Sequence, residues 1–91
     1  MSNEQIFRVA LSKEALKYYN KVDTATARRL DRCFTILESD PTKGRNIKPL
    51  KEASGGYRYR IGDLRIVYNV DLSERIVYVL AILPRGQVYK N

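Results

Sequence analysis

Residues 56–68 have the sequence GYRYRIGDLRIVY, in which two runs of alternating side chains flank Gly62 and Asp63. Such alternation is typical of β-strands, and a glycine at the first central position suits the tight turn of a two-residue hairpin. Counting outward from this turn predicts that Arg60 lies opposite Arg65. Because cross-strand partners share a face, one face of the hairpin is expected to be apolar and aromatic and the other rich in arginine.

The predicted arginine face carries Arg58, Arg60 and Arg65. Like charges directly opposite one another on a sheet cost roughly 0.2 to 1 kcal/mol, so the Arg60–Arg65 pair weakens the fold unless a counter-charge is present. An anionic ligand would supply that charge. The alternative is a solvated face with acidic neighbours, and the pattern alone leaves both open.

The sequence on either side of the hairpin predicts an α+β domain. Strands are expected at residues 6–11, 57–61, 64–70 and 75–83, and helices at residues 13–21 and 23–39. Ser12 and Asp23 are suitable N-caps, and Pro41 ends the second helix. The order β-α-α-β-β-β indicates two N-terminal helices packed on an antiparallel sheet, and residues 1–91 are expected to form one domain.

Residues 41–56 contain prolines, glycines and several cations without a clear period, and we expect them to form a basic loop. Arg45, Lys48 and Lys51 in this loop are candidate contacts to a phosphate backbone. The net charge of +7 on 91 residues agrees with a polyanionic partner, although charge alone does not distinguish nucleic acid, ribosome and acidic protein.

The chain has no histidine and a single cysteine, Cys33. An internal disulfide and a cysteine-rich or histidine-rich zinc site are therefore excluded, and no metal or other cofactor is expected. Cys33 falls on the apolar stripe of the second helix, which favours a buried, inert thiol. No signal pattern or long apolar run is present, so we expect a cytoplasmic protein that does not enter the membrane.

The chain after the last predicted strand contains Arg85 and Tyr89. If that strand pairs beside the second strand of the hairpin, this tail can reach the arginine face. A fraying basic terminus is the alternative, and the sequence does not separate the two.

The order of elements, the stretch from residue 56 to residue 68, and the closing Arg85 and Val88-Tyr89 together resemble the RelE/ParE toxin superfamily over nearly the whole chain. The resemblance implies a fold of the microbial RNase type. It also implies the toxin of a type II toxin–antitoxin system that enters the ribosomal A site and cleaves mRNA there without metal. An acidic, RelB-like antitoxin would hold it inactive, and operator DNA would be bound only through the antitoxin complex.

Carried over by position, the resemblance implies an active site built from Arg58, Arg60, Arg65, Arg85 and Tyr89. One departure affects the mechanism. RelE toxins often have lysines at the positions of Arg58 and Arg60, and an arginine does not lose its proton in proteins. The general base is therefore open: Tyr89 can serve as the base or stack on a splayed nucleobase.

Two other functions remain open. ParE toxins of the same superfamily poison DNA gyrase and are not nucleases, but they lack the complete arginine and tyrosine set, so the sequence favours RNA cleavage. A decayed toxin that binds only antitoxin and operator DNA is the third possibility.

Overall fold

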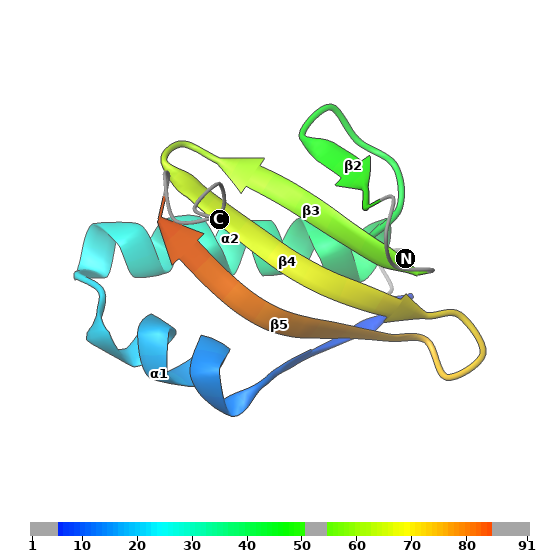
Figure 1. The fold of residues 1–91 in the computed structure, drawn as a ribbon, viewed down its shortest axis with the longest axis horizontal. Helices are drawn as coiled ribbons and strands as arrows, with labels where there is room; N and C mark the ends of the chain where they lie inside the picture. The colour runs from blue at the N-terminus through cyan, green and yellow to red at the C-terminus, as the bar shows by residue number, and fades with distance from the viewer. Residues whose placement is uncertain (1–5, 51–54, 85–91) are drawn as a thin grey trace, which may run out of the picture.

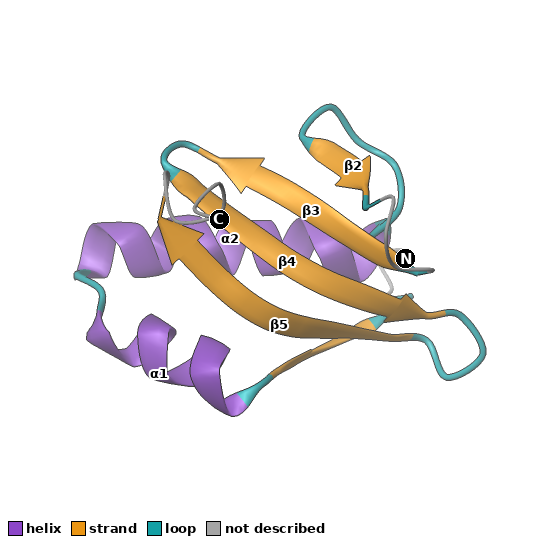
Figure 2. Ribbon diagram, in the orientation of Figure 1, coloured by secondary structure: helices purple, strands orange, loops and turns teal. Residues whose placement is uncertain are grey.

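The computed structural model describes residues 6–50 and 55–84, which form two helices and five strands (Figures 1 and 2). The strands are β1 (Arg8–Leu11), β2 (Ile47–Pro49), β3 (Gly56–Ile61), β4 (Leu64–Asp71) and β5 (Ile76–Pro84); the helices are α1 (Lys13–Lys21) and α2 (Thr24–Ser39). The strands form one sheet in the order β1-β5-β4-β3-β2. The predicted α+β fold, with two N-terminal helices packed on a sheet, is confirmed.

The sheet is antiparallel except at β1, which pairs with β5 in parallel. The expectation of a wholly antiparallel sheet is therefore wrong for this pair. Parallel neighbours need a long crossover connection, and here both helices and three strands lie between β1 and β5 in the chain. The alternation of residues 6–11 predicts a strand but carries no information about the direction of its partner.

Residues 41–56 were expected to form a loop without a strand, and this expectation is wrong, because they contain the strand β2. Ile47 pairs with Tyr59 and Lys48 with Arg58, so β2 extends the hairpin at its outer edge. A strand of three residues that ends in Pro49 is too short to show alternation. Proline is tolerated in an edge strand because an N–H at this position would point to the open side of the sheet, where no strand is present to accept its hydrogen bond.

The core lies between the helices and one face of the sheet. In Figure 1, α2 passes behind β3 and β4, and α1 lies beside β5. The buried residues that α2 contributes are Leu30, Cys33 and Leu37. Cys33 is buried, as predicted, and burial raises the pKa of its thiol to about 12.

Ser12 joins the start of α1 to an irregularity in β5. Its hydroxyl oxygen accepts a hydrogen bond from the Ala15 amide at 3.0 Å, as predicted for an N-cap, and donates one to the Leu80 carbonyl at 2.8 Å. Leu80 is the extra residue of a β-bulge, because Val67 pairs with Ala81 whereas Tyr68 pairs with Val79. The bulge shifts the alternation of β5, so that Val77 and Val79 are buried before it and Ile82 is buried after it.

Within the part of the chain that the structure describes, neither helix is long and apolar enough to cross a membrane.

Candidate functional site

The β3–β4 hairpin has the predicted register. Arg60 pairs with Arg65 and Arg58 with Val67, and the core-facing partners Tyr59 and Ile66 lie opposite each other. Two adjacent strands therefore bring three arginines onto the face of the sheet opposite the helices. The predicted arginine face is confirmed.

Gly62 is required at the turn for two reasons. Its φ is +59°, and Asp63 is not among the described non-glycine residues of positive φ, which matches a type II′ turn rather than type I′. A Cβ at position 62 would also lie 3.1 Å from Arg29 Nη1 of α2. A larger residue would strain the backbone at this φ, whereas the end of the Arg29 side chain would have to move by only a few tenths of an ångström, so the turn favours glycine mainly for its backbone conformation.

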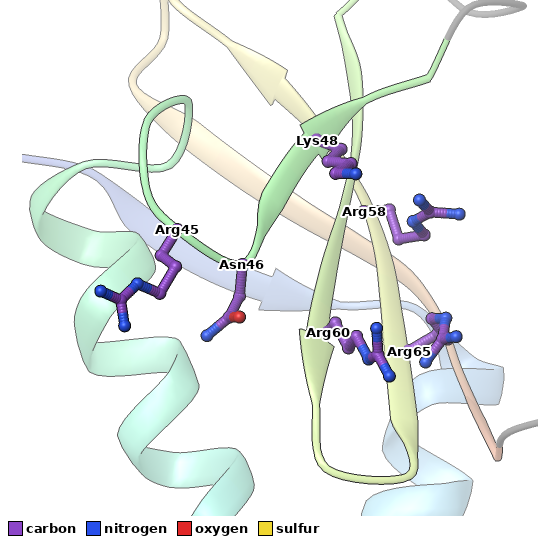
Figure 3. Close-up of a pocket in the computed structure, with 6 residues that line it drawn as sticks. All are labelled: Arg45, Asn46, Lys48, Arg58, Arg60 and Arg65. Atoms are coloured by element: carbon purple, nitrogen blue, oxygen red, sulfur yellow. The ribbon is translucent and has the colours of Figure 1, made fainter.

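The arginine face is hollowed into a pocket of about 210 Å³, shown in Figure 3. We call it the arginine pocket. Its described lining is rich in cations and consists of Arg45, Asn46, Lys48, Arg58, Arg60 and Arg65. Of the residues predicted as phosphate contacts, Lys48 lies beside the hairpin arginines, because the strand β2 pairs it with Arg58. Arg45 also lines the pocket, but its guanidinium points toward α2, away from the hairpin arginines (Figure 3).

The cationic side chains of the pocket differ in their exposure to solvent. Arg65 is only 5% exposed, whereas Arg60 is exposed and Arg58 is half-buried. A buried guanidinium has fewer conformations available than an exposed one, so Arg65 is the most pre-organised cation of the pocket.

The charge pattern of the pocket favours an anion. Two cross-strand pairs, Lys48–Arg58 and Arg60–Arg65, place like charges opposite each other, and the described lining contains no carboxylate. A pair of this kind costs roughly 0.2 to 1 kcal/mol, and at Lys48–Arg58 an anionic ligand would offset that cost. Arginine makes paired hydrogen bonds to phosphate oxygens, so a phosphate group fits this lining best.

Asn46 is a pocket residue that the sequence reasoning missed. Its backbone carbonyl accepts a hydrogen bond of 3.0 Å from the Arg60 amide, and its side chain is hydrogen-bonded to the hydroxyl of Tyr59. Burial raises the pKa of Tyr59, and the bond from Asn46 acts in the opposite direction. One asparagine in a loop with no period gives no sequence signal; only the pairing of β2 with β3 brings it to the pocket.

The described tyrosines of the hairpin do not line the pocket. Tyr68 is fully buried on the core face, where its hydroxyl donates a hydrogen bond of 2.7 Å to the Pro41 carbonyl and its ring stacks on Tyr57 with centroids 5.8 Å apart. Burial raises the pKa of Tyr68 further above its ordinary value. These tyrosines belong to the core.

Three residues predicted for the site, Lys51, Arg85 and Tyr89, lie outside the described residues. Within residues 6–50 and 55–84, no group of three or more His, Cys, Asp or Glu side chains could hold a metal ion. The described lining consists of arginine, lysine and asparagine, none of which readily accepts a proton at neutral pH. The described lining is therefore suited to binding an anion such as phosphate and includes no side chain suited to accepting a proton.

Comparison with known proteins agrees with this geometry. The family model described as the ParE toxin of the type II toxin–antitoxin system, parDE, matches residues 9–89. A Methanocaldococcus jannaschii protein assigned as toxin RelE1 is 30% identical over 87 residues, which cover 93% of this chain and 97% of that protein.

This chain also matches toxin chains in solved structures. The RelE–RelB complex of Pyrococcus horikoshii contains a chain that matches with a TM-score of 0.80 and 29% identity, over 90% of this chain and 98% of that one. The intact RelBE toxin–antitoxin complex of E. coli contains a chain that matches with a TM-score of 0.75 over 88% of this chain and 96% of that one. At 18% identity the E. coli match supports the fold alone.

Proposed function

Because the chain belongs to the RelE/ParE superfamily of type II toxin–antitoxin toxins, we propose that it is an endoribonuclease that cleaves mRNA on the ribosome. The observation that carries the proposal is the arginine pocket, whose described lining includes five cationic residues, with Lys48, Arg58, Arg60 and Arg65 on the face of the sheet opposite the helices. Such a pocket fits the phosphate of an RNA strand, and RNA cleavage needs positive charge where the phosphorane forms.

The proposed reaction needs no metal. The 2′-oxygen of one nucleotide forms a bond to its own 3′-phosphorus, and the bond from phosphorus to the 5′-oxygen of the next nucleotide breaks. The proton of the 2′-hydroxyl passes to a base, and the leaving 5′-oxygen takes up a proton. The products are a 2′,3′-cyclic phosphate and a 5′-hydroxyl end.

In this reaction Arg65 and Arg85 hold the scissile phosphate, while Arg58 and Arg60 stabilise the charge that develops on it. Neither Arg58 nor Arg60 can be the base, because a guanidinium keeps its proton. Tyr89 either accepts the proton or stacks on a splayed nucleobase. Arg45, Lys48 and Lys51 contact the phosphates on either side.

The proposed partners are the mRNA in the ribosomal A site and an acidic, RelB-like antitoxin, so the protein would act in the cytoplasm. The solved relatives are named as complexes of a RelE toxin with RelB. The chain has a net charge of +7, and the long-range field of such a protein attracts an acidic protein as well as RNA. Operator DNA would be bound only through the antitoxin complex.

Inhibition of DNA gyrase is the second candidate, since the matching family model is that of the ParE toxin. The two candidates differ in phenotype on expression. Blocked translation supports the nuclease, whereas an SOS response with filamentous cells supports gyrase inhibition. A toxin that has lost its activity would cause no growth arrest.

The proposal is tested by primer extension on a message translated in a cell-free system, with and without ribosomes. The wild type is expected to cut only when ribosomes are present, and Arg60→Ala is expected to lose the cuts. Arg8→Ala is the matched control, because Arg8 is equally exposed but lies in β1, separated from β3 by β4 and β5. Intact message with wild-type protein, or equal loss of cutting in Arg8→Ala, argues against the proposal.

A further inference from the structure

The arginine pocket contains one neutral residue, and its chemistry differs from that of its neighbours. The five cations among the described lining residues donate hydrogen bonds and accept none. They suit phosphate oxygens, which only accept. The amide of Asn46 is the one described lining side chain with an acceptor oxygen.

Asn46 is held in place from both its backbone and its side chain. The Arg60 amide donates to its carbonyl at 3.0 Å, and the side-chain amide is hydrogen-bonded to Tyr59, a core residue that is 7% exposed.

Figure 3 shows how the side-chain amide of Asn46 is oriented. The amide nitrogen of Asn46 lies on the side of α2, and the amide oxygen is turned toward the strands that carry the arginines. The pocket thus holds an oriented acceptor next to a cluster of donors. This combination fits a ligand that has both anionic oxygens and a neighbouring hydrogen-bond donor.

The pocket has a volume of about 210 Å³, which is large enough for a phosphate and the sugar next to it. In RNA the hydrogen-bond donor adjacent to a 3′-phosphate is the 2′-hydroxyl. DNA has no donor at this position.

From these observations we infer that Asn46 accepts a hydrogen bond from the 2′-hydroxyl next to the bound phosphate, and so makes the arginine pocket select RNA over DNA. The 2′-hydroxyl is the group by which a protein distinguishes the two nucleic acids at a given site. Asn46 does not take the proton of this hydroxyl: the hydrogen bond holds the hydroxyl in the bound ground state and breaks when the proton passes to the base. The inference rests on the proposed function for the identity of the ligand.

The test is a binding measurement that does not require cleavage. Fluorescence polarisation gives the affinity of the isolated protein for a short single-stranded RNA, without ribosomes, and for the same RNA with a single 2′-deoxy substitution moved along the strand. For the wild type we expect one position at which the substitution weakens binding by roughly threefold to tenfold, the effect of one hydrogen bond. In Asn46→Ala this penalty should disappear at that position.

Two further variants separate Asn46 from a general loss of binding or of fold. Lys48→Ala is the matched control: it should weaken binding of every oligonucleotide alike and keep the deoxy penalty, because a phosphate contact does not sense the sugar. Tyr59→Phe removes the hydroxyl that holds the amide and should reduce the penalty without abolishing it. A structural defect would change affinity for all oligonucleotides and leave their ratio unchanged.

The inference is overturned if Asn46→Ala keeps the full deoxy penalty, or if the wild type binds all the oligonucleotides equally or none of them. Its failure is distinct from failure of the proposed function. Ribosome-dependent cutting by the wild type together with an unchanged penalty in Asn46→Ala rejects the role of Asn46 alone, whereas absence of cutting rejects the nuclease.

Discussion

The two faces of the β3–β4 hairpin are built from neighbouring residues of the same strands and have opposite properties. Tyr59, Ile66 and Tyr68 are buried against the helices, and Arg58 and Arg60, each next to Tyr59 in sequence, line the pocket on the other side. Because side chains alternate along a strand, one register fixes both faces at once. A slip of one residue would expose the core and bury the arginines, so here the site cannot shift unless the fold shifts with it.

The two faces also contribute differently to the stability of the fold and to binding. The apolar face stabilises the fold by burial, whereas the arginine face carries like-charge pairs that oppose folding and favour a bound anion. Substitutions on the arginine face should therefore reduce activity, and substitutions on the apolar face should reduce stability. The four predictions below test this separation.

The largest effect is expected for Arg65→Ala. Removing one pre-organised donor from a developing anion costs roughly 10² to 10³ in rate, and Arg65 is the most buried cation of the pocket. Arg65→Lys should recover part of the rate, since lysine keeps the charge but cannot bind phosphate through two hydrogen bonds. The measurement is the single-turnover rate of mRNA cleavage on ribosomes, corrected for the folded fraction. Wild-type rates in Arg65→Ala would remove Arg65 from the mechanism.

Ile66→Ala changes the next residue, on the opposite face. Ile66 is fully buried, so the free energy of unfolding should fall by roughly 2 to 5 kcal/mol. The cleavage rate per folded molecule should stay close to that of the wild type. Urea denaturation together with the cleavage assay measures both quantities. A large loss of rate in the folded fraction would show that the two faces are not independent.

Tyr68→Phe tests a single polar contact within the core. It removes the donor to the Pro41 carbonyl, which is bonded at 2.7 Å, and should lower the free energy of unfolding by about 1 to 3 kcal/mol. Tyr78→Phe is the control, since Tyr78 is 45% exposed and its change should stay within about 0.5 kcal/mol. Equal effects in the two variants would argue against a specific role for the Pro41 contact.

Alkaline pH should destabilise the core through Cys33. Burial raises the pKa of this thiol from 9.0 to about 12, so above pH 9 the unfolded chain ionises while the folded chain does not. The free energy of unfolding should fall by about 1 kcal/mol between pH 9 and 10. Cys33→Ala should lose this part of the pH dependence. If the slopes of the two proteins are equal over this interval, another group is responsible.

The sequence predicts the hairpin and its two faces because the constraint is local. A glycine turn of two residues and strict alternation define the register without any knowledge of the partners. The helices are predicted for a similar reason: Ser12 and Asp23 cap them, and Pro41 follows the second. Both caps are present in the structure, where the Asp23 carboxylate accepts from the Thr26 amide at 3.1 Å.

The features that the sequence does not reveal depend on contacts between distant segments. The strand β2 forms because it pairs with β3. The bulge at Leu80 arises where β5 pairs with β4, and the direction of β1 is set by its parallel pairing with β5. Asn46 lies at the pocket because it directly precedes β2, which pairs with β3. The roles of Lys51, Arg85 and Tyr89 remain predictions, because these residues lie outside the described part of the chain.

The most direct test of the central claim, that one hairpin separates stability from activity by face, is the double variant Arg58→Ala with Arg60→Ala. Both side chains line the pocket and each faces another cation, so their removal should leave the free energy of unfolding within about 1 kcal/mol of the wild type or raise it. Ribosome-dependent cleavage should fall by at least about 10². A variant that unfolds, or one that cuts mRNA at the wild-type rate, would contradict the account.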